Sequence, residues 1–112
     1  MLKHSLEFII EGDVKDLLIE ACLGQHFVGE APFAVIFTAV YSRSKWRYGL
    51  RAYRYIHLDC GFAAENLYLI AESLGLGTVA IGAFDDEKIS VLLQLSDDEL
   101  PMLVMPVGRY RD

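Results

Sequence analysis

The stretch SLGLGTVAIGAFDDEKISVLL, residues 73–93, decides the fold of this chain because it sets three glycines around a short apolar run. Gly75 and Gly77 predict the end of a long helix, since only glycine adopts left-handed backbone angles without strain. Gly82 follows the apolar run and admits two interpretations. It is either part of a plain turn between a strand and the next helix, or a position where a flat ligand lies against backbone that carries no side chain.

The residues around these glycines predict a strand, a helix and a second strand. Residues 78–83 are branched or small and predict the first strand. Asp85 or Asp86 then caps the next helix, because an aspartate side chain accepts hydrogen bonds from the first helical N–H groups. The three acids at 97–99 form a loop that we expect to face solvent and to bind no metal. Residues 102–107 predict the last strand.

The chain upstream predicts a helix, a strand and a long helix. Asp13 is a candidate N-cap for a first helix that ends near Gly24. Residues 33–41 are apolar on both faces and rich in branched and aromatic side chains, so we expect a central strand. The segment from about Trp46 to Leu74 keeps apolar residues at helical spacing. Its other faces are also apolar, so we expect a helix that is buried nearly all round.

The composition predicts one domain with more apolar surface than its own interior can cover. The 112 residues are 54% hydrophobic, with a mean hydropathy of +0.30. A chain of this length buries only about two-thirds of its unfolded surface. We therefore expect an apolar face that is covered by a partner, most simply a second copy. The small residues of 61–64 let another helix approach closely, so the dimer contact is expected there.

Charge and motif content argue against several classes of function. A net charge of −6 and a pI near 4.9 disfavour binding to nucleic acid or to an anionic membrane. No uncharged run approaches the roughly 20 residues of a membrane helix. The three histidines have no acidic neighbour at ligand spacing, so no metal site is expected. Cys22 and Cys60 have no framework spacing, which predicts small apolar side chains in a reducing, cytoplasmic setting.

Two groups of basic residues keep alternative interpretations. Five of the ten basic residues lie among aromatic residues: Arg43, Lys45, Arg47, Arg51 and Arg54. Such a cluster can bind nucleic acid, but the acidic chain as a whole favours a solvated helix start whose charges pair with acids. Arg109, just past the last predicted strand, can hold a phosphate bidentately or be a surface arginine near the chain end.

Five short motifs, in order and in register, resemble the nitroreductase-like FMN oxidoreductases. They are YGLRAYRY at 48–55, DCGFAAENL at 59–67, GLG at 75–77, IGAFDD at 81–86 and PVGR at 106–109. The most similar branch contains the azoline-oxidising dehydrogenases that form thiazoles and oxazoles. The resemblance extends from Leu6 to Arg109 and corresponds to the family's C-terminal half.

The resemblance implies an α+β fold in which a long central helix packs on a small, mainly antiparallel sheet. Residues 1–112 would then be a single domain with a partial fold, lacking the family's N-terminal phosphate-binding part. The family forms intertwined homodimers with an FMN at each end of the interface. Ala80, Ile81, Gly82 and Ala83 would lie along the isoalloxazine edge, with the N–H of Gly82 or Ala83 directed at the flavin N5 and O4 atoms. Arg109 would sit near the ribityl phosphate.

The function that the resemblance implies is an FMN-dependent oxidoreductase that passes electrons from NAD(P)H to a small acceptor. The alternative is a non-catalytic dimeric scaffold, or a half-protein that has lost flavin binding. Azoline-oxidising relatives carry a Lys-Tyr pair that corresponds to Arg47-Tyr48 here. An arginine with a pKa above about 12 does not act as the base that a lysine can become. We therefore expect a plainer flavin reductase activity.

Overall fold

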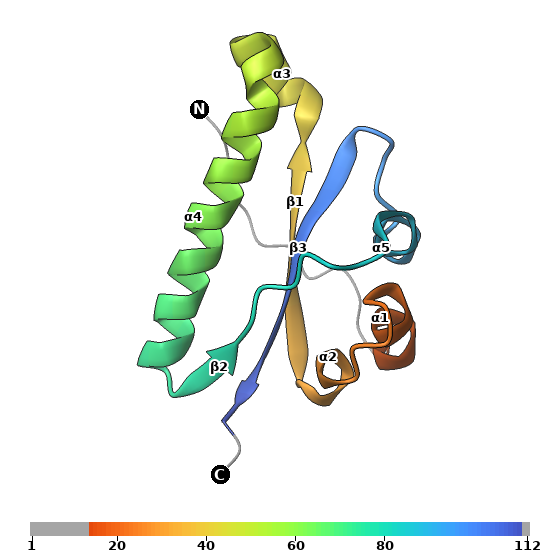
Figure 1. The fold of residues 1–112 in the computed structure, drawn as a ribbon, viewed down its shortest axis with the longest axis vertical. Helices are drawn as coiled ribbons and strands as arrows, with labels where there is room; N and C mark the ends of the chain where they lie inside the picture. The colour runs from red at the N-terminus through yellow and green to blue at the C-terminus, as the bar shows by residue number, and fades with distance from the viewer. Residues whose placement is uncertain (1–13, 111–112) are drawn as a thin grey trace.

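The computed structural model describes residues 14–110 (Figure 1). Its elements in chain order are α1 (Lys15–Ala21), α2 (Phe27–Glu30), β1 (Phe33–Val40), α3 (Tyr41–Tyr48), the 3₁₀ turn η1 (Gly49–Arg51), α4 (Ala52–Ser73), β2 (Leu76–Thr78), α5 (Asp86–Leu93) and β3 (Glu99–Arg109). The expected N-cap Asp13 lies outside the described residues, and Val14 occupies the N-cap position of α1 without a capping side-chain bond. Gly24, with a φ of +80°, follows the end of α1 as predicted.

The three strands form one antiparallel sheet in the order β1-β3-β2. The expectation that residues 33–41 form a central strand is therefore wrong for the described residues, because β1 pairs with β3 alone. A continuous apolar run reports burial on both faces of a strand, not the number of its strand neighbours. In this structure Phe33 is exposed and the other residues of β1 are only half-buried, with Ala34 and Ile36 packed against the hydrophobic core. The central strand is β3, which is also longer than the predicted 102–107.

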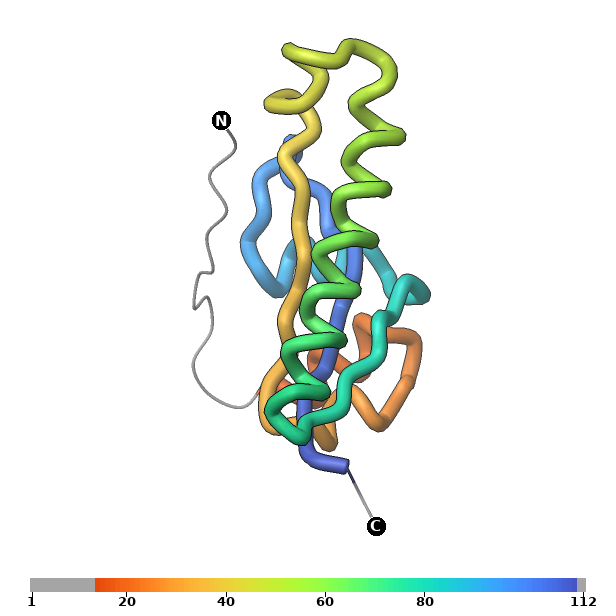
Figure 2. The backbone as a smooth tube through the Cα atoms, turned by 90° about the vertical axis from the view of Figure 1, so that its left-hand side faces the viewer, coloured from red at the N-terminus to blue at the C-terminus, as the bar shows by residue number. Residues whose placement is uncertain are grey.

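Helices cover both faces of this sheet. Figure 1 shows α4 on one side and α1, α2 and α5 on the other, and Figure 2 shows α4 lying along the strands. The core beside α1, α2 and α5 contains Cys22, Ile89 and Val104, none of which is exposed. Because neighbouring strand residues point to opposite faces, Met105 and Val107 point toward α4. No helix among residues 14–110 combines the length and the apolar character needed to cross a membrane.

The expected long helix is interrupted near its start. Gly49 has a φ of +61° and ends α3, after which η1 leads into α4. The apolar spacing did not predict this break, because a single glycine inside an apolar pattern costs a helix only about 1 kcal/mol. The far end agrees with the prediction, since Gly75 has a φ of +74° just after α4. Gly77 does not end the helix; it lies in β2, where an added Cβ would come within 3.1 Å of the Tyr110 ring.

The stretch after α4 follows the predicted order with different bounds. β2 covers only three residues and ends at Thr78, the first residue of the predicted strand 78–83. Of the rest of that predicted strand, only Ile81 pairs with the sheet, through an isolated bridge to Val104. Asp85 is the N-cap of α5, as predicted, and its Oδ1 accepts the Lys88 N–H at 3.1 Å. The stretch between β2 and α5 is therefore mostly neither strand nor helix.

Candidate functional site

Residues 79–85, here called the crossing segment, pass over β3 from β2 to α5 (Figure 1). Ile81 holds the middle of the segment to β3: its N–H donates to the Val104 carbonyl at 2.9 Å, and its carbonyl accepts the Val104 N–H at 3.1 Å. Upstream, the Ala80 N–H donates to the Tyr68 hydroxyl at 2.6 Å. The segment is thus anchored to both the sheet and α4.

The end of the crossing segment is tied to α1. The Gln25 side-chain amide donates to the Ala83 carbonyl at 2.9 Å and to the Cys22 carbonyl at 2.7 Å. The Asp85 N–H donates to the Ala21 carbonyl at 2.7 Å. A surface segment with hydrogen bonds at this many points is held more firmly than an ordinary loop.

This anchoring fixes the direction of the Gly82 N–H. The Ile81 carbonyl points to β3, and a planar trans peptide directs the following N–H the opposite way. The Gly82 N–H therefore points away from the sheet. Within residues 14–110 neither Gly82 nor Ala83 donates a backbone hydrogen bond, and both residues are exposed. The segment presents donors that a bound molecule could use.

The chain's own structure does not require glycine at position 82. An added Cβ would meet no atom within 4 Å, and the φ of Gly82 lies outside the left-handed region. Neither a turn nor close packing within the described residues therefore explains why this residue lacks a side chain. Of the two interpretations of the sequence, the structure gives no support to a turn that needs glycine.

Arg109 lies at the other end of the β2–β3 ladder, where it pairs with Leu76. It lies five positions after Val104 along β3, about 17 Å away at roughly 3.4 Å per residue. The exposed guanidinium makes no ion pair within residues 14–110. Residues 80–83 thus form one continuous segment, and Arg109 does not contact it. A ligand that touches both must extend along the ladder.

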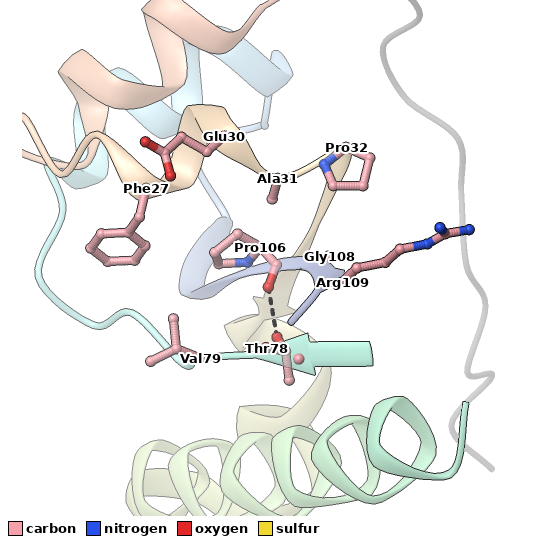
Figure 3. A pocket seen from close by; sticks show the side chains of 10 residues that line it. Phe27, Glu30, Ala31, Pro32, Thr78, Val79, Pro106, Gly108 and Arg109 are labelled. Carbon is pink, nitrogen blue, oxygen red and sulfur yellow. Dashed lines mark hydrogen bonds between the residues drawn. The ribbon is translucent and has the colours of Figure 1, made fainter. Parts of the chain in front are cut away.

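Arg109 also borders a hollow of about 300 Å³ between α2 and the ends of β2 and β3 (Figure 3). The hollow is lined by Phe27, Glu30, Ala31, Pro32, Gly77, Thr78, Val79, Pro106, Gly108 and Arg109. The Thr78 hydroxyl donates to the Pro106 carbonyl at 2.8 Å, and this bond joins β2 to β3. In Figure 3 the Arg109 side chain extends away from Glu30, so the two charges do not meet across the hollow.

Asp97 and Asp98 lie in an exposed turn, as expected, whereas Glu99 is half-buried at the start of β3. The Asp98 carboxylate accepts hydrogen bonds from the Ser42 N–H, at 3.3 Å, and from the Ser42 hydroxyl. The Glu99 carboxylate accepts one from the Thr38 hydroxyl. These bonds fasten the start of β3 to the junction of β1 and α3. In the described part of the chain, no three metal-ligating side chains come together.

The two cysteines do not provide a reactive thiol. Cys22 is fully buried in the core and Cys60 is half-buried on α4, and neither forms a disulfide. Burial raises the pKa of both thiols above the ordinary value. Both thiols therefore stay protonated near neutral pH. Because the thiolate is the nucleophilic form, neither group is expected to be reactive. The interpretation as small apolar residues is confirmed for Cys22, which lies in the hydrophobic core.

The expected dimer contact at 61–64 is divided between two faces of α4. Ala64 is only 5% exposed and packs within the chain, whereas Phe62 is 70% exposed. Small residues therefore do not form one open stripe. The exposed side of α4 instead carries large apolar side chains among exposed polar ones: the apolar residues are Leu58, Phe62, Leu69 and Ile70, with Leu74 at the C-cap.

Tyr68 and Gln25, the side chains that hold the crossing segment, are not among the site residues expected from the sequence. Tyr68 carried a weak signal, because a tyrosine among aliphatic helix residues usually has a hydrogen-bond partner for its hydroxyl. Gln25 carried none, since the Ala83 carbonyl that it contacts lies 58 residues away in the sequence. Both contacts depend on how α4 and α1 pack around the sheet.

Comparison with known proteins gives relatives along nearly the whole chain. A sequence profile described as the nitroreductase family matches residues 1–109. The chain is 45% identical over 107 residues to a nitroreductase-like protein of Methanocaldococcus jannaschii, covering 96% of this chain and 53% of that protein. It is 30% identical over 112 residues to the NAD(P)H FMN reductase of Bacillus subtilis, covering 88% of this chain and 45% of that enzyme. The chain spans about half the length of these curated relatives.

Among solved structures, a chain of the E. coli microcin synthetase complex matches with a TM-score of 0.84 at 21% identity, covering 96% of this chain and 41% of that chain. At that identity the likeness shows the fold alone. The fold class expected from the sequence, a long helix on a small antiparallel sheet, is confirmed by this match and by the family profile. On that profile and architecture, the chain belongs to the nitroreductase family.

Proposed function

We propose that this chain contributes to an FMN-dependent oxidoreductase that passes electrons from NAD(P)H to a small acceptor. The family and the similarity to an FMN reductase support flavin chemistry in general. When bound, FMN would take up a hydride from the reduced nicotinamide and pass its electrons to the acceptor.

The residues present fit the flavin. Gly82 leaves bare backbone with an outward N–H, so a flat ring can approach the Ala80–Ala83 edge without meeting a side chain at that position. A backbone N–H can donate a hydrogen bond to a ring acceptor and stabilise charge there. Arg109 can hold a phosphate, because its guanidinium is always charged and has no carboxylate partner among the described residues.

The observation that carries this proposal is the glycine at 82 that the chain's own backbone and packing do not need. A residue without a side chain, beside a donor that points outward, is what close approach of a ligand requires. A scaffold without cofactor would gain from a residue with a side chain there, because glycine loses the most conformational freedom on folding.

We further infer that two copies form a homodimer through the exposed apolar face of α4. Phe62 is 70% exposed, Leu69 60% and Leu58 52%, and they lie along one helix. Apolar surface of this kind is normally covered by a partner. A cytoplasmic location fits the two unpaired cysteines and is part of the same proposal.

Flavin binding tests the proposal directly. The purified protein is titrated with FMN while quenching of flavin fluorescence is followed, and NAD(P)H oxidation is then measured with a quinone or a nitroaromatic compound as acceptor. Saturable binding and acceptor-dependent oxidation are expected. A protein that stays a dimer but binds no FMN at millimolar concentration would instead be the non-catalytic scaffold.

A further inference from the structure

We propose that Tyr68 is a positioning residue that selects which backbone donor of the crossing segment meets the flavin. The proposal rests on the proposed flavin function and deepens it. It begins with the gap in the sheet between Thr78, where β2 ends, and Ile81, which forms only an isolated bridge. Beside this gap, the Tyr68 side chain of α4 accepts a hydrogen bond from backbone that faces away from β3.

The Tyr68 hydroxyl accepts the Ala80 N–H at 2.6 Å, and both residues are half-buried. Ile81, the next residue, turns its N–H toward β3. Successive N–H groups of extended backbone alternate in direction, so those of Ala80 and Gly82 point away from β3, along the same edge. The Tyr68 hydroxyl therefore occupies the Ala80 N–H and leaves the Gly82 N–H available to a ligand.

The consequence is one presented donor instead of two. Without the hydroxyl, Ala80 and Gly82 would offer N–H groups roughly 7 Å apart along the edge. Among residues 14–110 the Val79–Ala80 peptide would lose the one hydrogen bond that it makes, and it would rotate more easily. The bonds between Ile81 and Val104 would still direct the Gly82 N–H away from β3, but the segment before it would lose its anchor to α4, so the position of this donor would become less well defined. Tyr68 thus acts on the flavin through the backbone and need not touch it.

The first arm of the test uses the cofactor-free protein. Hydrogen exchange of backbone amides is measured by NMR in the wild type and in Tyr68→Phe, which keeps the ring and removes the acceptor. We expect the wild-type Ala80 amide to exchange at least tenfold more slowly than the Gly82 amide, and this protection to be lost in the variant. Equal exchange of the two amides in the wild type would overturn the proposal without any mutation.

The second arm measures the flavin itself. Tyr68→Phe is expected to raise the Kd for FMN about three- to tenfold and to make the midpoint potential of the bound flavin more negative, because the donor that stabilises its reduced form is less well aligned. Tyr55→Phe is the matched control on the same helix, since the Tyr55 hydroxyl makes no hydrogen bond within residues 14–110. Its Kd and potential should equal those of the wild type.

The outcomes separate this inference from the proposed function. If Tyr68→Phe loses the protection of the Ala80 amide but keeps the wild-type Kd and midpoint potential, the positioning role is overturned. The proposed flavin function would then still stand. A wild type that binds no FMN would overturn the proposed function, and the selection of a flavin donor would fall with it. Loss of Ala80 protection together with a shifted potential, absent in the Tyr55→Phe control, would support the proposal.

Discussion

Substituting Gly82 by alanine and then by valine separates the stability of the chain from its affinity for flavin. The added Cβ meets no atom within 4 Å, and the backbone at 82 is not left-handed, so neither clash nor strain is introduced in the described residues. Both variants should therefore change the free energy of unfolding by less than about 0.5 kcal/mol. That corresponds to a shift in Tm of about 2–4 °C at most for a domain near this size.

The expected effect on FMN is larger and graded. A single methyl group at 82 would stand between the ring and the backbone and lengthen the hydrogen bond from the Gly82 N–H. Loss of one such bond is worth about 0.5–1.5 kcal/mol, so Gly82→Ala should raise the Kd for FMN about three- to tenfold. The branched side chain of Gly82→Val should raise it more than tenfold, which is over about 1.4 kcal/mol.

The assay pairs a fluorescence-quenching titration of FMN with thermal unfolding followed by circular dichroism, both on the dimeric protein. Gly61→Ala serves as the control, because an added Cβ at Gly61 also meets nothing within 4 Å while the residue lies on α4 away from the crossing segment. A Gly82→Val protein with wild-type Kd and wild-type Tm would refute the reasoning. A large loss of stability would show that position 82 is packed in the assembled protein.

Four further changes have defined outcomes. Arg109→Ala should weaken FMN binding by about 1.5–3 kcal/mol with little change in Tm, measured by the same titration. Asp85→Ala removes the cap of α5 and should lower the free energy of unfolding by about 1 kcal/mol in urea titrations. Phe62→Glu should convert a dimer to a monomer in sedimentation velocity, and a wild type already monomeric at micromolar concentration would contradict this. The hydrogen bond from Tyr110 to Glu72 raises the pKa of the Tyr110 hydroxyl. The stability that this bond adds is present below about pH 10, the pKa of the unfolded chain, and is lost as the pH rises through the pKa of the folded protein. Tyr110→Phe should flatten that part of the Tm–pH curve.

The features that could be predicted from the sequence are those with a local cause. The left-handed Gly75 ends α4 and the Asp85 side chain caps α5, because each acts within one helical turn of its own position. The antiparallel sheet under a long helix also followed, from the family motifs. Position 82 could be singled out because a glycine between an apolar run and a helix cap is visible without any tertiary contact.

The features that could not be predicted depend on residues far apart in the sequence. The bonds from Ser42 to Asp98 and from Thr38 to Glu99 span 56 and 61 residues, so the sequence did not predict the hydrogen-bond partners of these two acids. The edge position of β1 in the sheet that residues 14–110 form depends on strand order, which an apolar run does not encode. The sequence shows that Ala64 is small, but it does not show which side of the helix faces the sheet. Ala64 was therefore expected in the dimer contact, although it packs within the chain.

The dimer and the flavin site are coupled by the physics of the Gly82 edge. The N–H of Gly82 is exposed in a single chain, and a hydrogen bond in open water adds little, because water competes for the donor. The same bond gains strength when a covering surface excludes water. The described chain supplies a donor edge on the crossing segment and an arginine at the far end of the β2–β3 ladder, but above Gly82 it supplies no cover within 4 Å of an added Cβ. If that cover comes from a second copy, Phe62→Glu should weaken FMN binding as well as the dimer, although Phe62 lies on α4 and not on the crossing segment. A monomeric Phe62→Glu protein that keeps wild-type FMN affinity would show that each chain covers its own flavin.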